Sequence, residues 1–512
     1  MSLGLRYNQP VGSEHDSIRK VVRVARRQDK LELTPDDLSR MDDAHRRLQA
    51  LFNTGETIYG VSTGFGPLKS ERISLEKASQ LQTNLIRSHA CGVGPPLKED
   101  QTRAMMALLA LSLSKGASGV PASLAQAVVD LLNNDIVPVV PSRGSLGASG
   151  DLAPLAHAAL VLIGEGEAVY QGRRMPGREA LSAAGLSPIE LTPKCGLSLI
   201  NGTHAHTGIA CLLWTDMERL IKTAEIAAAM SIEAMLGSAK PFGSVARLKP
   251  HPGQLASSAN LDRLLAGSAI VASHAGCAEV QDAYSMRCAP HVLGAARQTH
   301  LHLGETLLRE LESVTDNPLL VDGEAVSAGH FHGQAVGFAL DYAAMGLAEI
   351  ASISERRAAR ILDASMSRGL PAFLVAEPGL NSGFMIAQYT AAALVSENKT
   401  LCHPASVDSI PTGANQEDHV SMAMTAALKA TDVLKNAQTV VAIELLCAAQ
   451  GLEFRKRETG LKAAKGTGTA LEAVREAVPF LESDAPLAPM IEKVLQIEDV
   501  VERVEQAIGE MV

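Results

Sequence analysis

Apolar residues recur at helical spacing over most of this chain. The long stretches of this kind cover residues 206–237, 258–277, 298–312, 333–364, 383–402 and 416–453, and Gly, Pro or Asn residues separate them. Shorter stretches cover Gln101–Lys115 and Ser123–Asn133. This pattern predicts a mainly α-helical protein in which long antiparallel helices pack as a large bundle.

The N-terminal part of the chain has a different pattern. The run Thr34-Pro35-Asp36-Asp37 offers an N-cap, a proline in the first turn and acidic residues, and it predicts a helix towards Phe52. Glycines then interrupt ETIYGVSTGFGP, over 56–67, whose β-branched and aromatic residues predict short extended pieces and a loop. We therefore predict a smaller mixed region over 1–110, which carries the Tyr59 loop, and a helical bundle over 111–512, which carries a glycine-rich loop over 144–155.

The composition supports a helical protein. Of the 512 residues, 46% are hydrophobic but only 3% are aromatic, so the apolar content comes from small and aliphatic residues, among which Ala, Leu and Met favour helices. The later helices are rich in Ala and poor in charge, which indicates burial on most sides. Such burial requires either a large core or interfaces between subunits.

Charge and hydropathy narrow the classes of partner. The net charge of -10 comes from mixed acidic and basic residues without a basic stripe, which argues against nucleic acid. Apolar stretches such as 155–163 and 440–449 are interrupted well short of the roughly 20 residues that cross a bilayer, so we expect no membrane span. The N-terminus has no apolar signal core and the seven cysteines form no C-x-x-C pair, which predicts a cytoplasmic protein with free thiols.

The glycine-rich segment GSLGASGDLAP, over 144–154, contains the triplet Ala148-Ser149-Gly150. The triplet alone is not specific, because Ala-Ser-Gly also occurs at 117–119, where it is expected to follow the end of a helix. One interpretation of 144–155 is a loop that starts a helix, with Asp151 as N-cap. A second is a phosphate-binding turn, although the lysine of a P-loop is missing.

In its longer context this segment resembles the cofactor loop of the aromatic amino acid ammonia-lyase family, and further segments from about Tyr59 to Met422 resemble that family in the same order. The resemblance implies that the Gly150 nitrogen attacks the Ala148 carbonyl and that loss of water leaves an electrophilic methylidene-imidazolone group. Gly150 allows the tight backbone turn, Ala148 adds little bulk, and Ser149 supplies the hydroxyl that leaves. The implied reaction is elimination of ammonia, with no bound metal or nucleotide.

The resemblance also implies roles for individual residues. Tyr59, in YGVSTGFG, matches the base that removes the β-proton, and it needs an electropositive setting because a free tyrosine has a pKa of about 10. Arg287, in QDAYSMRC, matches the arginine that grips the substrate carboxylate. Tyr284 and Gln281 match residues near the cofactor, and Asn201 matches an asparagine that hydrogen-bonds there. Taken singly, each could be an ordinary structural polar residue.

Three further positions surround the implied substrate ring. Phe331, in GHFHG, matches an aromatic wall, and His89, in SHACGVG, matches a residue that faces the ring and implies a polar ring. Glu417, in NQEDHVSM, resembles the histidine-specific members of the family. A carboxylate accepts an imidazole N–H, whereas beside a phenyl ring it would be buried without a partner. Histidine is therefore the expected substrate, with trans-urocanate as the product.

Other interpretations stay open. YGVSTGFGPL, QDAYSMRCAP and FHGQ resemble bacterial tyrosine lyases equally well, and an aromatic aminomutase would use the same electrophile. Cys195, His204 and His206 depart from the usual family pattern. A metal-dependent hydrolase would draw on the histidines at 89, 204, 206, 330, 332 and 419, but no matching set of Glu ligands accompanies them. A helical binding or structural protein would leave the glycine-rich loops without a catalytic purpose.

The resemblance implies a quaternary structure as well. Family members assemble as homotetramers whose sites combine loops from more than one subunit, which agrees with the Ala-rich helices of this chain.

Overall fold

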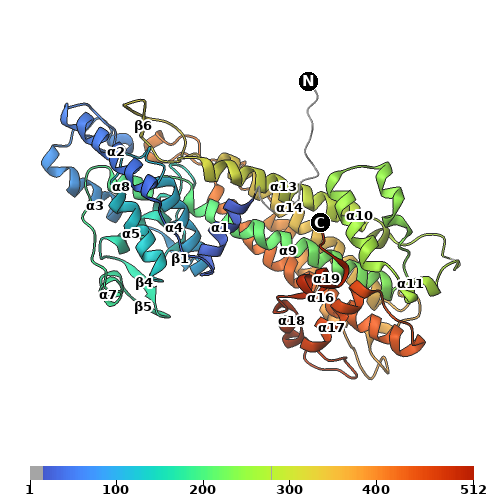
Figure 1. Ribbon diagram of the computed structural model, residues 1–512. Helices are drawn as coiled ribbons and strands as arrows, with labels where there is room; N and C mark the ends of the chain where they lie inside the picture. Colours follow the sequence, from blue (N-terminus) through green and yellow to red (C-terminus); the bar gives the residue numbers. More distant parts are fainter. Residues whose placement is uncertain (1–14, 278) are drawn as a thin grey trace.

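A bundle of long helices runs through the middle of the molecule (Figure 1). The computed structural model describes residues 15–277 and 279–512. The bundle helices are α9 (His204–Ala234), α13 (Ala289–Glu312), α14 (Gln334–Leu362) and α16 (Ala423–Thr459), and α15 (Met385–Leu401) packs beside α14 and α16. Their facing sides form one continuous apolar core. The predicted mainly α-helical bundle is confirmed.

One end of the bundle carries a lobe built from residues 35–200, drawn in blue to green in Figure 1. Its helices are α2 (Pro35–Asn53), α3 (Ala78–His89), α4 (Glu99–Leu113), α5 (Ala122–Asn133), α6 (Leu152–Leu162), α7 (Gly177–Ala183) and α8 (Cys195–Ile200). Its strands are β1 (Val93–Pro96), β2 (Val137–Pro138), β3 (Pro141–Arg143), β4 (Glu167–Tyr170) and β5 (Arg173–Pro176). β1 pairs with β3, and β4 lies between β2 and β5, all antiparallel. The division of the chain at residue 110 stays a prediction.

The remaining elements lie along the bundle and at its other end. α1 (Asp16–Ala25) packs against α4 and α9, and the hairpin of β6 (Leu319–Val321) and β7 (Glu324–Val326) precedes α14. The far end is covered by α10 (Pro252–Leu265), α11 (Ala269–Ser273), α12 (Tyr284–Arg287), α17 (Lys465–Ala477), α18 (Ala488–Leu495) and α19 (Val500–Ile508).

Helix directions place several N-termini at one end of the bundle. The Thr203 hydroxyl, just before α9, donates to Glu310 in the last turn of α13 at 2.5 Å, so α13 runs antiparallel to α9. A Cβ on Gly333, just before α14, would lie 2.6 Å from Nε2 of His206 in the first turn of α9, and a Cβ on Gly337 would lie 3.4 Å from Ala423, where α16 begins. α9, α14 and α16 therefore start together.

The predicted helix boundaries are right in some places and wrong in others. α2 begins with the predicted cap, because Asp37 N donates to Thr34 Oγ1 at 3.1 Å and Thr34 N donates to Asp37 Oδ2 at 3.0 Å. The helices predicted at 258–277 and 298–312 instead begin at Pro252 and Ala289, each with a proline in the first turn. A first turn needs no intrahelical N–H, so proline begins these helices and does not break them.

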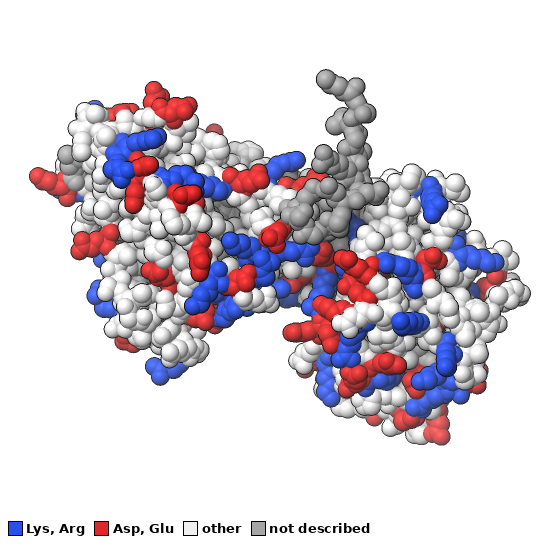
Figure 2. All heavy atoms as spheres, in the orientation of Figure 1, with Lys and Arg blue, Asp and Glu red and all other residues white. Residues whose placement is uncertain are grey.

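The most apolar helices are buried in the core, and the surface carries charges of both signs. α14 and α16 are long and apolar enough to cross a membrane by length and composition, but 67% and 78% of their most apolar windows are buried inside the protein. The core helices of globular proteins meet the same test. On the face shown in Figure 2, acidic and basic side chains are interspersed.

Candidate active site

Ser149 and Glu417 meet at the end of the bundle where α9, α14 and α16 begin. The Ser149 hydroxyl donates to Glu417 Oε1 at 3.0 Å, and the Thr412 hydroxyl donates to Glu417 Oε2 at 2.7 Å. The backbones of Thr412 and Glu417 also exchange hydrogen bonds of 3.0 and 3.3 Å. Both oxygens of the carboxylate are therefore held, one of them by Ser149.

The backbone at Gly150 is folded tightly against Gly202. Gly202 N donates to Ser149 O at 3.3 Å and Asp151 N donates to Gly202 O at 2.8 Å, so the Gly150 N–H itself takes no part in this bridge. Gly150 has a φ of 74°, and a Cβ there would lie 2.0 Å from Gly202 O. Only glycine fits this position.

The segment that follows Glu417 holds the other side of the same loop. Met422 N donates to Leu146 O at 2.8 Å, and the Ser421 hydroxyl donates to Gly147 O at 3.2 Å. A Cβ on Gly147 would lie 2.1 Å from Ser421 Oγ. The loop over 146–151 is thus clamped between residue 202 and residues 421–422.

Asp151 does not cap the helix that it precedes. It stands just before α6 but makes no side-chain cap there, and its buried Oδ2 accepts hydrogen bonds from Ala205 N at 2.9 Å and His206 N at 3.0 Å, at the start of α9. His206 Nδ1 lies 2.8 Å from the same oxygen. Burial acts to raise the pKa of Asp151 and to lower that of His206, but their attraction prevails, so the pKa of Asp151 is lowered and that of His206 is raised. Asp151 thus occupies the N-cap position of α6, as one interpretation of the sequence expects, but its side chain binds the start of α9 and makes no cap hydrogen bond to α6.

The electrostatic field at the loop comes partly from helix ends. α6 begins directly after the loop, and the first turns of α9, α14 and α16 surround it. Each helix N-terminus carries a partial positive charge from its unpaired N–H groups. This end of the bundle therefore favours groups that are negatively charged.

Tyr59 lies half-buried close to Glu417. Its hydroxyl oxygen accepts a hydrogen bond from Gly66 N at 2.9 Å, and its ring meets the Phe65 ring edge-on. Burial raises the pKa of Tyr59 and the charge of Glu417 raises it further, while the Gly66 hydrogen bond acts against both. Within one chain, burial and the charge of Glu417 therefore oppose ionisation of Tyr59, and a further positive charge is needed for it to act as a base.

His89 presents a defined nitrogen to the site. His89 Nδ1 lies 2.9 Å from Leu85 O, and because a carbonyl oxygen only accepts, Nδ1 carries the proton. Burial lowers the pKa of His89, although the charge of Glu417 opposes this, so the ring is held neutral. Nε2 is then left with a lone pair and acts as a hydrogen-bond acceptor.

Asn201 is oriented by a buried polar cluster. Its amide nitrogen donates to Asp316 Oδ1 at 3.2 Å and to Asn317 O at 3.1 Å, which leaves the side-chain carbonyl oxygen as an acceptor. Asp316 Oδ2 in turn accepts from Lys194 Nζ at 2.6 Å and from Ser198 Oγ at 2.8 Å. This cluster fixes the side chain one residue before Gly202.

Gln281, Tyr284 and Arg287 lie at the other end of α9. Asp282 accepts from Ser238 N at 2.7 Å, just beyond the last turn of α9, and from Arg368 Nη2 at 2.9 Å. α9 has 31 residues and so is about 45 Å long, which separates this group from Asp151 and Ser149 within one chain. The Tyr284 side chain is 71% exposed, and the Arg287 guanidinium lies 4.7 Å from the centre of its ring.

The predicted site residues therefore form two groups in one chain. The structure brings together Tyr59, His89, Ala148, Ser149, Gly150, Asn201 and Glu417, and places Phe331, two residues before Gly333, at the same end of the bundle. Gln281, Tyr284 and Arg287 form a distal group.

Comparison with known proteins shows the family of the chain. Residues 17–476 match the model of the family described as aromatic amino acid lyase. The chain belongs to the aromatic amino acid lyase family. Among its relatives are proteins called histidine ammonia-lyase from Natranaerobius thermophilus, 47% identical over 97% of this chain and 99% of the relative, and from Myxococcus xanthus, 50% identical over 94% and 95%.

Solved structures of the family have the same fold. A tyrosine aminomutase from Streptomyces globisporus superposes with a TM-score of 0.92 at 36% identity, covering 97% of this chain and 98% of the other. A histidine ammonia-lyase from Trypanosoma cruzi superposes with a TM-score of 0.88 at 37% identity, covering 96% and 94%.

Family resemblance did not identify the residues that position the site. Gln82 is fully buried, and its side chain donates to Gly60 O at 2.9 Å and accepts from Leu197 N at 3.0 Å, which joins the Tyr59 loop to α8. Thr412 directs Glu417 as described above. A polar residue within the apolar face of a helix was the available signal for Gln82, whereas Thr412 carried no signal beyond its nearness to Glu417 in sequence.

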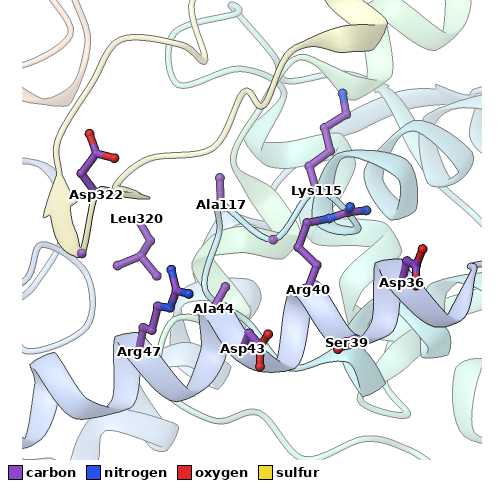
Figure 3. A pocket seen from close by; sticks show the side chains of 12 residues that line it. Asp36, Ser39, Arg40, Asp43, Ala44, Arg47, Lys115, Ala117, Leu320 and Asp322 are labelled. Atoms are coloured by element: carbon purple, nitrogen blue, oxygen red, sulfur yellow. The ribbon is translucent and has the colours of Figure 1, made fainter.

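The second Ala-Ser-Gly triplet, over 117–119, is built differently. Ala117 O accepts a hydrogen bond from Leu320 N at 2.8 Å, and Gly119 O lies 2.9 Å from His45 Nδ1. Ala117 borders an open pocket of about 490 Å³ beside α2 (Figure 3). Lys115 also lines this pocket, and its ammonium donates to Leu311 O and Ser313 O. In this triplet Gly119 N donates to Gly116 O at 3.0 Å, whereas the Gly150 N–H takes no part in the bridge to Gly202.

The histidines named in the metal-hydrolase interpretation do not gather at one point. His206 pairs with Asp151, and burial lowers the pKa of His204 to about 4. His332 stacks on His419 with ring centres 5.8 Å apart. Within residues 15–277 and 279–512, no three His, Cys, Asp or Glu side chains are grouped as metal ligands would be.

Proposed function

We propose that this chain is a histidine ammonia-lyase that converts L-histidine to trans-urocanate and ammonia, using a methylidene-imidazolone group formed from Ala148, Ser149 and Gly150. The observation that carries this proposal is the 3.0 Å hydrogen bond between Ser149 and Glu417. It places a carboxylate suited to an imidazole N–H beside the residue that would become the electrophile. The histidine ammonia-lyases among the relatives support the same substrate.

The loop fits formation of this group. The Gly150 N–H takes no part in the Gly202 bridge, and the compact turn that cyclisation requires exists in the chain before any reaction. Ser149 bears a hydroxyl that can leave. When formed, the group supplies an electrophile that assists departure of the α-amine.

Ring recognition is assigned to His89 and Glu417. Loss of the Ser149 hydroxyl on maturation would free Glu417 Oε1 to accept an N–H of the substrate ring. His89 Nε2 offers a second acceptor, and an imidazolium ring, which carries two N–H groups, can donate to both. A phenyl ring would leave the carboxylate without a donor, which disfavours phenylalanine. Phe331 is assigned to the wall of the ring pocket.

The distal group is assigned to the site of another copy of the chain. Gln281, Tyr284 and Arg287 lie too far from Ser149 to act in the same chain, so we assign them to a neighbour's site in a homotetramer. Arg287 would then bind the substrate carboxylate and supply the positive charge that Tyr59, the assigned base, lacks in one chain. The Asn201 carbonyl oxygen is assigned to hold a donor at the reacting centre.

Exposed apolar residues support the assembly. Phe338, Tyr342 and Met345 follow each other at helical spacing on α14 and are 53%, 44% and 41% exposed, and Ile386 and Tyr389 of α15 are 55% and 59% exposed. A stripe of this kind is typical of an interface between subunits. The cysteines of the described residues are free, which suits the cytoplasm as the compartment.

Ultraviolet absorbance of the purified protein with histidine, tyrosine or phenylalanine tests the substrate, because elimination conjugates a double bond to each ring. We expect growth of the urocanate band with histidine alone, and no band from Ser149→Ala with any of the three. Coumarate from tyrosine in place of urocanate would reject histidine as the substrate, and an unimpaired Ser149→Ala would reject the electrophile.

A further inference from the structure

The hydroxyl of Ser149 must leave during formation of the electrophile, and Glu417 is the residue that holds it. Glu417 Oε1 lies 3.0 Å from Ser149 Oγ, which is within the distance for direct proton exchange. The other carboxylate oxygen is fixed by Thr412, so the direction of Oε1 is set before any substrate binds.

The other ionisable groups near the loop are engaged elsewhere. Asp151 accepts hydrogen bonds from Ala205 N, His206 N and the Ser145 hydroxyl, and it pairs with His206. The Tyr59 oxygen accepts from Gly66 N and His89 Nδ1 donates to Leu85 O, whereas the Ser149 hydroxyl donates to Glu417. Glu417 is thus the titratable side chain whose oxygen contacts the leaving group.

We infer that Glu417 is the acid–base group that dehydrates Ser149 during maturation of the protein, before it serves the substrate ring. In this step the Cα–H and Cβ–Oγ bonds of Ser149 break and a Cα–Cβ double bond forms. The Glu417 carboxylate takes up the Cα proton and returns a proton to Oγ, so that one water leaves and the carboxylate is regenerated. The second water of the overall conversion comes from the Ala148 carbonyl oxygen after attack by the Gly150 nitrogen.

The inference rests on the proposed conversion of residues 148–150 and gives Glu417 two successive tasks at one position. Glu417 Oε1 accepts the hydrogen bond of the Ser149 hydroxyl before dehydration. When that hydroxyl has left, the same oxygen is free to accept an N–H of the substrate ring. Dehydration and substrate recognition are therefore coupled through one contact.

The mass of the tryptic peptide over 144–173 measures dehydration without any assay of activity. We expect the wild-type peptide to lack two water molecules and Glu417→Gln to retain the Ser149 hydroxyl. Glutamine keeps the shape of the side chain but does not exchange a proton, so dehydration in freshly made protein should be on the order of a hundredfold slower. The matched control is Asp418→Asn, which removes the exposed carboxylate next to Glu417 in the sequence and should dehydrate like the wild type. Ser149→Ala has no hydroxyl at this position and gives the mass of a peptide in which dehydration of residue 149 does not occur.

The outcomes separate the two proposals. A wild-type peptide of unmodified mass would overturn the proposed function, whereas a wild-type peptide and a Glu417→Gln peptide that dehydrate equally fast would overturn this inference alone. Circular dichroism checks that Glu417→Gln is folded. Should it fail to fold, Glu417→Asp provides the test, since its shorter carboxylate should dehydrate more slowly than the wild type, and an equal rate would contradict the role.

Discussion

The direction of the Glu417 carboxylate depends on a short turn that starts at Thr412. Replacement of Thr412 by valine keeps the size of the side chain but removes the 2.7 Å hydrogen bond to Oε2. A hydrogen bond to a charged group is worth about 1.5–3 kcal/mol, so kcat/KM for histidine should fall by roughly tenfold to a hundredfold, mainly through KM. Steady-state kinetics of the matured protein measure this. Thr439→Val, at a half-buried position of α16 where the hydroxyl donates to Lys435 O, is the matched control, and equal kinetics for both variants would show that Thr412 does not position Glu417.

At the scale of single residues, the sequence predicted groups that react and missed groups that orient them. Ser149, Glu417 and His89 belong to short motifs that can be recognised locally. Asp316 orients Asn201, from which it is separated by more than a hundred residues in the sequence. Gln82 holds the Tyr59 loop through a backbone group, the carbonyl of Gly60. Local sequence therefore does not identify the partner of either residue, although the position of Gln82 on an apolar helix face is unusual for a polar residue.

At the scale of elements, the buried pair of Asp151 and His206 joins the cofactor loop to α9. The raised pKa of His206 means that its contribution to stability is fully present below about pH 6.5, its unfolded value, and is lost as pH rises through the folded pKa. The lowered pKa of Asp151 means that its contribution is present above about pH 4 and is lost as pH falls through the folded pKa. The pair therefore stabilises the fold most between these limits.

Replacement of His206 by glutamine should destabilise the protein by about 3–5 kcal/mol near pH 6, because it leaves Asp151 buried without its charged partner. The difference from the wild type should shrink as pH rises above the folded pKa of His206. Urea unfolding at several pH values measures this, with the exposed His403→Gln as control. A difference that is constant with pH would show that His206 is not charged in the folded protein.

Element boundaries were predictable where apolar spacing was unbroken. The ends of α9 and α14 fall within a few residues of their predictions, whereas α16 begins at Ala423 and not at 416, because 412–422 forms the turn that clamps the loop. That turn depends on Leu146 and Gly147, far away in sequence, so periodicity alone does not locate it.

At the scale of the whole molecule, the separation of Arg287 from Ser149 predicts complementation between inactive variants. Ser149→Ala and Arg287→Gln should each be inactive alone. If each site takes Ser149 from one copy and Arg287 from another, random mixed assembly during co-expression should restore about a quarter of the sites. Urocanate formation by the mixed protein measures this, and no recovery would mean that both residues serve the same chain's site.

The length of α9 also has a consequence for symmetry. If the distal group of one copy completes the site of a second, a twofold axis across the helices lets the second copy return the same contribution to the first. Such an isologous contact closes on itself and completes two sites at once. Catalysis would then obey mass action: dilution below the dissociation constant of the assembly would remove both sites of a pair together.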